Sequence, residues 1–266
     1  MSAPALVMIA HGSADPRVAQ VTHALRTSLA AIRPGLHVHC AFLDKCPPSP
    51  TQIVSQLAQQ GVGEVVLVPL ELTHAIDTDP AVTALVASWR DQHEGMSFVA
   101  SRPIGPEINL LTILDERLRA ALTAARALEL DGLVLSSASS GDVRGSALLA
   151  RRARQWSTHH RLPCLTAVAD GTGPSVTQAI QGLRSQGRRH IAVGSFFLTA
   201  DALFHSQTEL AHRGGAVAVS EPIGPAREVL DLVLARYAFA AMDLLDHDQV
   251  APSVSDVFGD EEWRSA

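Results

Sequence analysis

The sequence predicts an α/β protein made of two tandem three-layer αβα domains of similar fold, each with a parallel sheet of about four strands. Two observations support this prediction. Short β-rich runs alternate with longer helical patterns, and motifs of the first half return in the same order in the second half. Strands that alternate with helices form parallel sheets that helices cover on both faces, joined by right-handed crossovers.

The first half supplies the alternating pattern. It opens with an apolar run over residues 6–10, which predicts a strand. Apolar residues at helical spacing then predict an amphipathic helix that ends at residues 33–35: Val18, Val21, Leu25, Leu29 and Ile32. The remaining elements are strands over 36–42, 65–70 and 97–100, helices that begin near Ser49 and Asp79, and a helix over 107–128.

Three ordered matches relate the two halves and indicate an internal duplication. Pro-Ser-Pro-Thr-Gln at 48–52 returns as Pro-Ser-Val-Thr-Gln at 174–178, and Pro-Ile-Gly-Pro at 103–106 returns at 222–225. Ser13, Asp15 and Arg17 return as Ser140, Asp142 and Arg144. We therefore expect domains over residues 1–128 and 129–246, followed by an acidic, disordered tail over 247–266.

The formal net charge of −6 originates at the end of the chain. Residues from 243 onward carry seven acidic side chains and one arginine, while residues 1–242 carry 20 of each sign. A neutral body offers no basic surface to nucleic acid or to an anionic membrane. No apolar run reaches the roughly 18 residues of a membrane span, and no positively charged region precedes the first one, so we expect a soluble cytoplasmic protein.

Residue inventory excludes several chemistries. Lys45 is the only lysine and lies outside any Gly-x-x-x-x-Gly-Lys-[Ser/Thr] context, which excludes a P-loop. Neither Gly-x-Ser-x-Gly nor Gly-x-Gly-x-x-Gly occurs, which argues against an α/β-hydrolase and a dinucleotide-binding domain. We therefore expect no organic cofactor.

Three histidines follow predicted strands. His11 directly ends the first strand, His74 follows the third, and His205 follows the equivalent strand of the second half. Ligands of open parallel α/β sheets lie beyond the carboxyl ends of the strands, so these side chains are expected to face one edge or an interdomain cleft. Neutral imidazole binds divalent transition metals and accepts protons near neutral pH.

The opening segment carries a family resemblance. Residues 10–17, Ala-His-Gly-Ser-Ala-Asp-Pro-Arg, resemble the Ala-His-Gly-Ser-x-Asp-Pro-Arg opening of the class II tetrapyrrole chelatases of the CbiX/SirB type. Val-Val-Leu-Val-Pro-Leu at 65–70 and Phe-Phe-Leu at 196–198 are similar to the long, duplicated members of that family. The resemblance covers about residues 5–240 and implies two chelatase-like, flavodoxin-like domains.

The resemblance also implies an activity, the ATP-independent insertion of Fe²⁺ or Co²⁺ as a substrate into a reduced tetrapyrrole such as sirohydrochlorin. In that family, a histidine of the opening motif and a second one after the third strand serve as metal ligand and proton acceptor. His11 matches the first position. His74 comes about three residues earlier than the family pattern, so His74 and His205 are alternative partners. Ala138 replaces His11 in the repeat, which implies one active site per chain.

The tetrapyrrole carboxylates require local positive charge, because the body of the protein is neutral. The predicted substrate-binding residues are Ser13, Arg17, Arg102, Arg144 and His205. Acidic residues beside His74 offer a way to orient a histidine or to relay protons, although a helix N-cap and a solvated strand residue are equally simple roles for two of them: Glu71, Asp77 and Asp79.

Three functional hypotheses remain open from the sequence. The first is a sirohydrochlorin ferrochelatase that makes siroheme, with His11 as the main metal-handling base. The second is a cobaltochelatase of cobalamin synthesis with the same fold, and the third is a non-catalytic carrier of tetrapyrrole or metal. Because the duplication supplies in one chain what a short relative builds by dimerising, we expect a monomer with internal pseudo-twofold symmetry.

Overall fold

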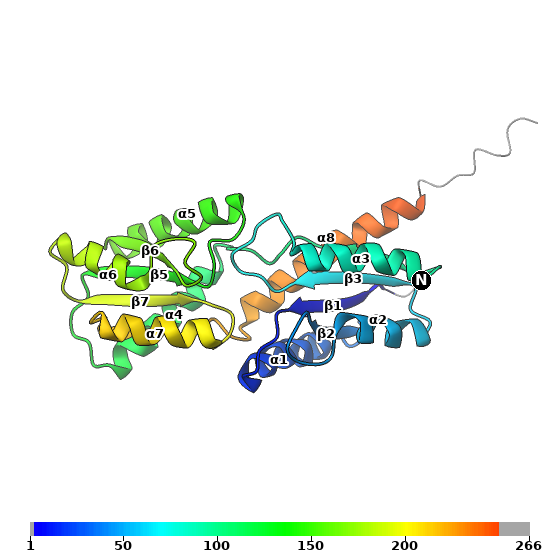
Figure 1. Ribbon diagram of the computed structural model, residues 1–266, viewed down its shortest axis with the longest axis horizontal. Helices are drawn as coiled ribbons and strands as arrows, with labels where there is room; N and C mark the ends of the chain where they lie inside the picture. Colours follow the sequence, from blue (N-terminus) through cyan, green and yellow to red (C-terminus); the bar gives the residue numbers. More distant parts are fainter. Residues whose placement is uncertain (1–2, 250–266) are drawn as a thin grey trace, which may run out of the picture.

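A computed structural model describes residues 3–249 (Figure 1). Strands and helices alternate along the chain. The strands are β1 (Ala5–Ala10), β2 (Val38–Phe42), β3 (Glu64–Pro69), β4 (Ser97–Ala100), β5 (Gly132–Ser137), β6 (Cys164–Val168), β7 (Ile191–Phe196) and β8 (Ala218–Val219). The helices are α1 (Pro16–Ile32), α2 (Pro50–Gln59), α3 (Pro80–Gln92), α4 (Leu110–Ala124), α5 (Val143–His160), α6 (Val176–Ser185), α7 (Ala202–Arg213) and α8 (Arg227–Gln249).

The strands form two parallel sheets of four strands, which confirms the predicted fold class. The first sheet has the order β2-β1-β3-β4 and the second has the equivalent order β6-β5-β7-β8. Leu6 pairs with both Val38 and Val66, so β1 lies between β2 and β3. Alternate residues of β1 enter different apolar clusters, Leu6 on one face and Val7 on the other. Both faces of the sheet are therefore buried, as in other parallel α/β sheets.

Local capping reproduces the sequence repeat in three dimensions. Ser49 accepts a hydrogen bond from the Gln52 backbone, and the Gln52 side chain accepts one from the Ser49 backbone. Ser175 and Gln178 form the same reciprocal pair at the start of α6. Each pair satisfies backbone N–H groups that have no partner within the helix. The matched segments at 48–52 and 174–178 therefore encode the same helix start in each half.

The structure shortens two predicted elements. The strand expected from residue 36 begins at Val38. Residues 34 and 35 form a turn and residue 36 a bend, so the chain becomes extended only after them. The helix expected over 107–128 spans α4 only. Arg126, two residues beyond α4, has a φ of +51°, a left-handed conformation that is incompatible with a continuing α-helix.

The last helix of each half covers the sheet of the other half. α8 packs on β3 and β4, whereas α4 packs on β7 and β8, and Figure 1 shows α8 running along the first sheet. The buried faces are apolar, with Ile113 and Leu114 on α4 and Val229 and Val233 on α8. A cut at residue 128, the predicted domain boundary, therefore separates α4 from the sheet that it covers. The order of the elements along the chain did not predict that α4 and α8 cover each other's sheets.

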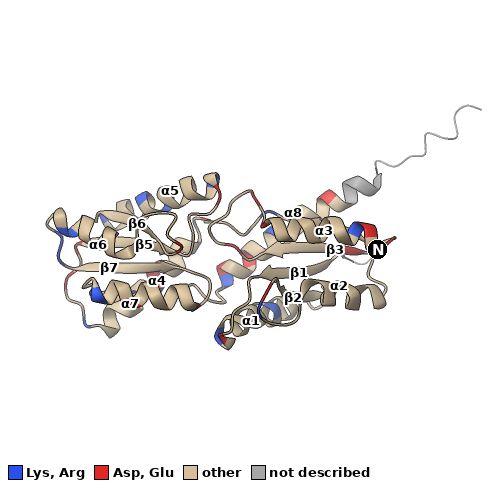
Figure 2. Cartoon of the chain, in the orientation of Figure 1, with Lys and Arg blue, Asp and Glu red and all other residues tan. Residues whose placement is uncertain are grey.

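The end of the chain differs from the prediction in one respect. The tail was expected from residue 247, but α8 extends through Gln249, and residues 250–266 lie outside the described part. None of the helices that the structure describes has the length and apolar character needed to span a bilayer. Figure 2 shows acidic and basic residues interspersed over both halves, in keeping with the predicted neutral body.

Candidate functional site

The two sheets point the carboxyl ends of their strands toward each other, and a cavity of about 570 Å³ lies between them (Figure 1). Loops that follow β1, β2 and β3 line it from one side, and loops that follow β5, β6 and β7 line it from the other. Open parallel α/β sheets bind their ligands beyond the carboxyl ends of the strands. The predicted interdomain cleft is thus present, and both halves contribute to it.

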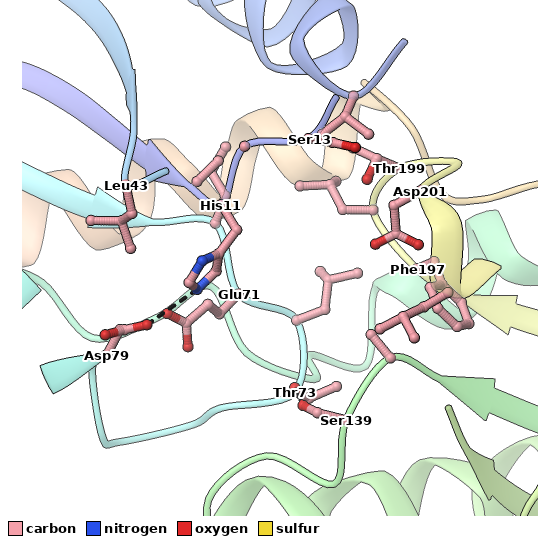
Figure 3. Close-up of a pocket in the computed structure, with 18 of the residues that line it drawn as sticks. His11, Ser13, Leu43, Glu71, Thr73, Asp79, Ser139, Phe197, Thr199 and Asp201 are labelled. Carbon is pink, nitrogen blue, oxygen red and sulfur yellow. Dashed lines mark hydrogen bonds and ion pairs between the residues drawn. The ribbon is translucent and has the colours of Figure 1, made fainter. Parts of the chain in front are cut away.

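His11 meets two carboxylates in this cavity. Its Nε2 lies 3.1 Å from Oδ2 of Asp79, and Glu71 completes a group whose potential ligand atoms all lie within 4.8 Å of one another. Figure 3 shows the His11 ring turned toward Asp79 and Glu71, with Phe197 and Asp201 of the second half on the opposite side of the cavity. Imidazole nitrogen and carboxylate oxygen are ligands for first-row divalent metals. We name this group the His11 cluster.

Asp79 serves the His11 cluster and the start of α3 at once. Its Oδ1 accepts a hydrogen bond from the Ala81 backbone at 2.7 Å, which caps the helix, while Oδ2 faces His11. Pro80 follows in the first turn of α3, where the backbone N–H that proline lacks would have no partner within the helix. The predicted N-cap is therefore present, and the same carboxylate also contributes to the candidate metal centre. The helix cap fixes the carboxylate in its orientation toward the imidazole.

His74 reaches the cluster through Glu71. Nδ1 of His74 and Oε2 of Glu71 are buried and face each other across 2.9 Å. Burial raises the pKa of the Glu71 carboxyl and the nearby Asp79 carboxylate adds to this, while His74 and His11 act in the opposite direction. His74 lines the cavity, but its atoms do not belong to the three-residue group. The structure therefore places a carboxylate beside His11 and uses His74 to hold that carboxylate.

The second half of the chain anchors the loop that carries His74. Oδ2 of Asp142 accepts hydrogen bonds from the backbones of residues 75, 76 and 77 at 2.8–3.0 Å, and Oδ1 accepts one from Gly145. Thr73 and Ser139 share a hydroxyl hydrogen bond of 2.6 Å. A Cβ atom on Gly141 would lie 1.9 Å from the carbonyl oxygen of Thr73, so only glycine permits this approach. Burial alone would raise the pKa of Asp142, but the backbone donors hold it well below its usual range.

The loop that carries His11 is held by a similarly close contact. The backbone N–H of Gly12 donates to Oδ1 of Asp44 at 2.7 Å. A Cβ atom on Gly12 would lie 2.0 Å from the Asp44 carbonyl oxygen. Nδ1 of His11 lies 4.0 Å from Oδ1 of Asp44, so this carboxylate is the neighbour of the imidazole on the side away from Asp79. Glycine at position 12 thus allows the loop after β2 to approach the end of β1.

The predicted site residues divide into two groups. Ser13 lines the cavity together with His11 and His74. The other predicted residues are not among those that line it: Arg17, Arg102, Arg144 and His205. Arg17 binds elsewhere, because its guanidinium donates three hydrogen bonds to the Asp15 carboxylate and one to Nε2 of His205 at 3.0 Å.

His205, expected as an alternative partner of His11, thus contacts Arg17 and is not among the residues that line the cavity. The hydrogen bonds from Arg17 lower the pKa of the Asp15 carboxyl to about 2. The contact between Arg17 and His205 joins the start of α1 to α7. Arg102 and Arg144 are exposed, the one after β4 and the other at the start of α5. These arginines were expected at the cleft because they lie close to loop edges in the sequence. The direction of each side chain, however, depends on tertiary packing.

Two functional residues were underestimated or missed. Glu71 was expected only as a helper to a histidine, yet its carboxylate lies in the His11 cluster. Asp142 was noted only as the repeat of Asp15. Part of the role of Asp142 was visible in the sequence, because the repeat of Asp15 as Asp142 points to a helix N-cap in each half. No sequence pattern indicates that its free oxygen accepts three donors from residues almost 70 positions earlier.

Comparison with known proteins agrees with the fold. The CbiX family pattern matches residues 5–121. A sirohydrochlorin cobaltochelatase of Methanopyrus kandleri is 24% identical over 138 residues, which is 44% of this chain and 96% of that protein. The sirohydrochlorin chelatase SirB of Bacillus subtilis subspecies spizizenii, solved with cobalt, covers 92% of this chain and 97% of its own at 16% identity, with a TM-score of 0.75. SirB from Bacillus subtilis with Fe³⁺ covers 92% of this chain and 98% of its own at 17% identity, with a TM-score of 0.73.

The facing α/β units, with the His11 cluster in the cleft between them, agree with the fold that the resemblance to the duplicated class II chelatases implies. The match to the CbiX family pattern lies in the half that carries His11 and His74, so this half of the chain resembles that family. The predicted resemblance is thereby confirmed.

Proposed function

We propose that this protein inserts a divalent metal ion into sirohydrochlorin, without ATP, and that the His11 cluster is where the metal is held and the protons are taken up. The observation that carries the proposal is the meeting of His11, Glu71 and Asp79 at the wall of a cavity between two sheets. The names of the relatives in the comparison support the substrate. Sirohydrochlorin and the metal are both substrates, so no resident cofactor is required.

Charge balance makes the cluster suitable for this reaction. Insertion exchanges one M²⁺ for the two protons of the pyrrole N–H groups. Glu71 and Asp79 together carry two negative charges when ionised, so they balance either the bound ion or the two protons that replace it. The raised pKa of Glu71 favours proton uptake when the ion leaves. His11, whose side chain is 58% exposed, is the member most accessible to a macrocycle.

The cavity also offers an apolar surface for the flat face of a tetrapyrrole. Leu43 lies on the His11 side, and Leu198 and Leu203 belong to the second half. Leu203 is 40% exposed, which is high for a leucine in a folded domain and leaves apolar area for a ligand to cover. The macrocycle would rest between the two halves with its nitrogen atoms toward His11, where metal and protons are exchanged.

For the metal, we favour Fe²⁺, with siroheme as the product. One imidazole and two carboxylates form a hard, oxygen-rich set, without the thiolates that select softer ions. Co²⁺ has nearly the same size and ligand preference, and the relative from Methanopyrus kandleri is named a cobaltochelatase. Anaerobic assays of the purified protein with each ion, at equal free concentration, decide between them: a kcat/KM for Co²⁺ equal to or above that for Fe²⁺ would reject the iron assignment.

A substitution tests the role of His11. We expect His11→Ala to reduce the rate of metal insertion by about 10²-fold or more, the scale of a lost general base. His212→Ala is the matched control, because His212 is an exposed histidine on α7 outside the cavity. The measurement is the absorbance change as sirohydrochlorin acquires the metal. A His11→Ala protein with wild-type rate would remove the basis of the proposal, and tight product binding without turnover in the wild type would favour a carrier instead.

A further inference from the structure

Lys45 is the only lysine of the chain, and it lines the cavity. Among residues 3–249, the other charged residues that line the cavity are carboxylates: Asp44, Glu71, Asp79, Asp170 and Asp201. Such a lining attracts a divalent cation but repels a polycarboxylate ligand. Among the described lining residues, Lys45 therefore supplies the positive charge, apart from the histidines, on a wall that is otherwise acidic.

The backbone around Lys45 is held in place while its side chain is left available. Asp44, directly before it, accepts the backbone N–H of Gly12, and Cys46 donates its backbone N–H to the Asp44 carbonyl oxygen at 2.7 Å. Lys45 itself has a φ of +59°, which non-glycine residues adopt rarely. Its Nζ lies 3.9 Å from Oδ2 of Asp44, and the side chain is 63% exposed. The ammonium can therefore exchange this long, solvated pair for a ligand carboxylate.

The arginines expected to bind the substrate do not fill this role at the cavity wall. Arg17 is engaged by Asp15 and His205, and Arg102 and Arg144 are not among the lining residues. Lys45 follows β2, the strand beside β1, so the ammonium and His11 belong to neighbouring loops at one sheet edge. A carboxylate bound by Lys45 would belong to the rim of a macrocycle whose nitrogen atoms lie at His11.

We propose that Lys45 binds a peripheral carboxylate of the tetrapyrrole and thereby sets the orientation of the macrocycle over the His11 cluster. This inference rests on the proposed function. It assigns the metal and the carboxylates to separate parts of one cavity, the acidic wall for the cation and the loop after β2 for the anion. Lys45 acts on binding of the tetrapyrrole and not on binding of the metal.

The test compares Lys45→Met with Lys45→Arg, which retains the charge, and with Arg151→Met, which removes a positive charge from an exposed position on α5. The measurement is the Kd of metal-free sirohydrochlorin, from fluorescence titration, beside KM for the tetrapyrrole and for the metal. For Lys45→Met we expect Kd and the tetrapyrrole KM to rise about tenfold, the scale of one lost hydrogen bond between charged groups. We expect KM for the metal in Lys45→Met to stay within about twofold of the wild-type value. Lys45→Arg and Arg151→Met should resemble the wild type in all three constants.

Selective chemistry gives a second measurement on the unmodified sequence. Acetylation neutralises Lys45 and the terminal amine, whereas reductive methylation retains both charges, so acetylated protein should bind sirohydrochlorin as weakly as Lys45→Met and methylated protein should not. Acetylated Lys45→Arg protein controls for the terminal amine. An unchanged Kd in Lys45→Met, with insertion at wild-type KM, would overturn the inference and leave the proposed function standing. Absence of both binding and insertion in the wild type would overturn the two together.

Discussion

At the scale of single residues, position 12 shows how one missing side chain shapes the site. His11 comes at the end of β1, and the loop after β2 reaches it only because Gly12 has no Cβ. The same contact holds the backbone that precedes Lys45. Gly12 therefore connects the histidine that we propose to handle the metal with the residue that we assign to carboxylate binding.

We expect Gly12→Ala to lower the free energy of unfolding by about 2 kcal/mol, because the new methyl group would overlap backbone atoms that cannot move independently of two loops. Insertion activity should fall further than stability alone explains. Gly35→Ala is the matched control, since a Cβ atom there has no neighbour within 4 Å. Chemical denaturation of both variants measures the difference, and equal stability of Gly12→Ala and wild type would show that the loops adjust freely.

At the scale of elements, the loop between β3 and α3 carries two of the three residues of the His11 cluster. Glu71 and Asp79 lie near its ends, and its middle is fixed by Asp142 from the other half. Asp142 also caps α5. One carboxylate thus joins a helix start to the loop that presents the proposed metal ligands.

Replacement of Asp142 by alanine should destabilise the protein by about 2 kcal/mol or more, because a helix cap and three loop hydrogen bonds are lost together. It should also weaken metal binding, which calorimetry with Co²⁺ measures. Asp91→Asn, at an exposed position on α3, is a control for removing one negative charge. Wild-type metal affinity in Asp142→Ala would indicate that the loop holds its shape without the anchor.

The pH dependence of this anchor follows from the lowered pKa of Asp142. A carboxyl whose folded-state pKa lies below its unfolded value of 3.8 stabilises the fold above that value. The stabilisation is lost as the pH falls through the folded pKa. The stability difference between wild type and Asp142→Asn should therefore be largest near neutral pH and should shrink below about pH 4. A difference that grows on acidification would contradict this assignment.

At the scale of the whole molecule, exchange of α4 and α8 makes the two halves depend on each other. Without α8, one face of β3 and β4 would lose its apolar cover, and without α4, one face of β7 and β8 would lose its own. The core that the two helices share includes residues of both halves, such as Leu114 and Val233. We therefore predict that neither half folds independently.

A fragment of residues 1–128 should consequently not exist as a folded monomer. We expect it either to aggregate or to dimerise, with each α4 covering the sheet of the partner copy, because the exposed apolar face needs a helix. Light scattering combined with circular dichroism distinguishes these states. A monomeric fragment with a cooperative unfolding transition would show that α8 is dispensable. For the full chain, the monomer expected from the duplication remains a prediction that the same measurement checks.

Much of this molecule follows from local sequence. Apolar spacing and capping residues predicted the alternation of strands and helices, because both act within a few positions of the chain. The repeat of Ser49 as Ser175 predicted two similar halves, and the place of His11 after a strand predicted its presence in the cleft. The family resemblance added the chemistry, which periodicity alone does not contain.

Tertiary structure alone decided which groups meet. It brought Glu71 and Asp79 to His11, directed Arg17 to His205, and exchanged α4 with α8. The physical reason is that side-chain directions and helix destinations depend on contacts between residues far apart in sequence, where no local periodicity operates. The sequence by itself predicted the two similar halves of the protein and the place of His11 after a strand. The packing of the loops after β1 and β3, the second of which Asp142 anchors, determined the carboxylate partners of that histidine.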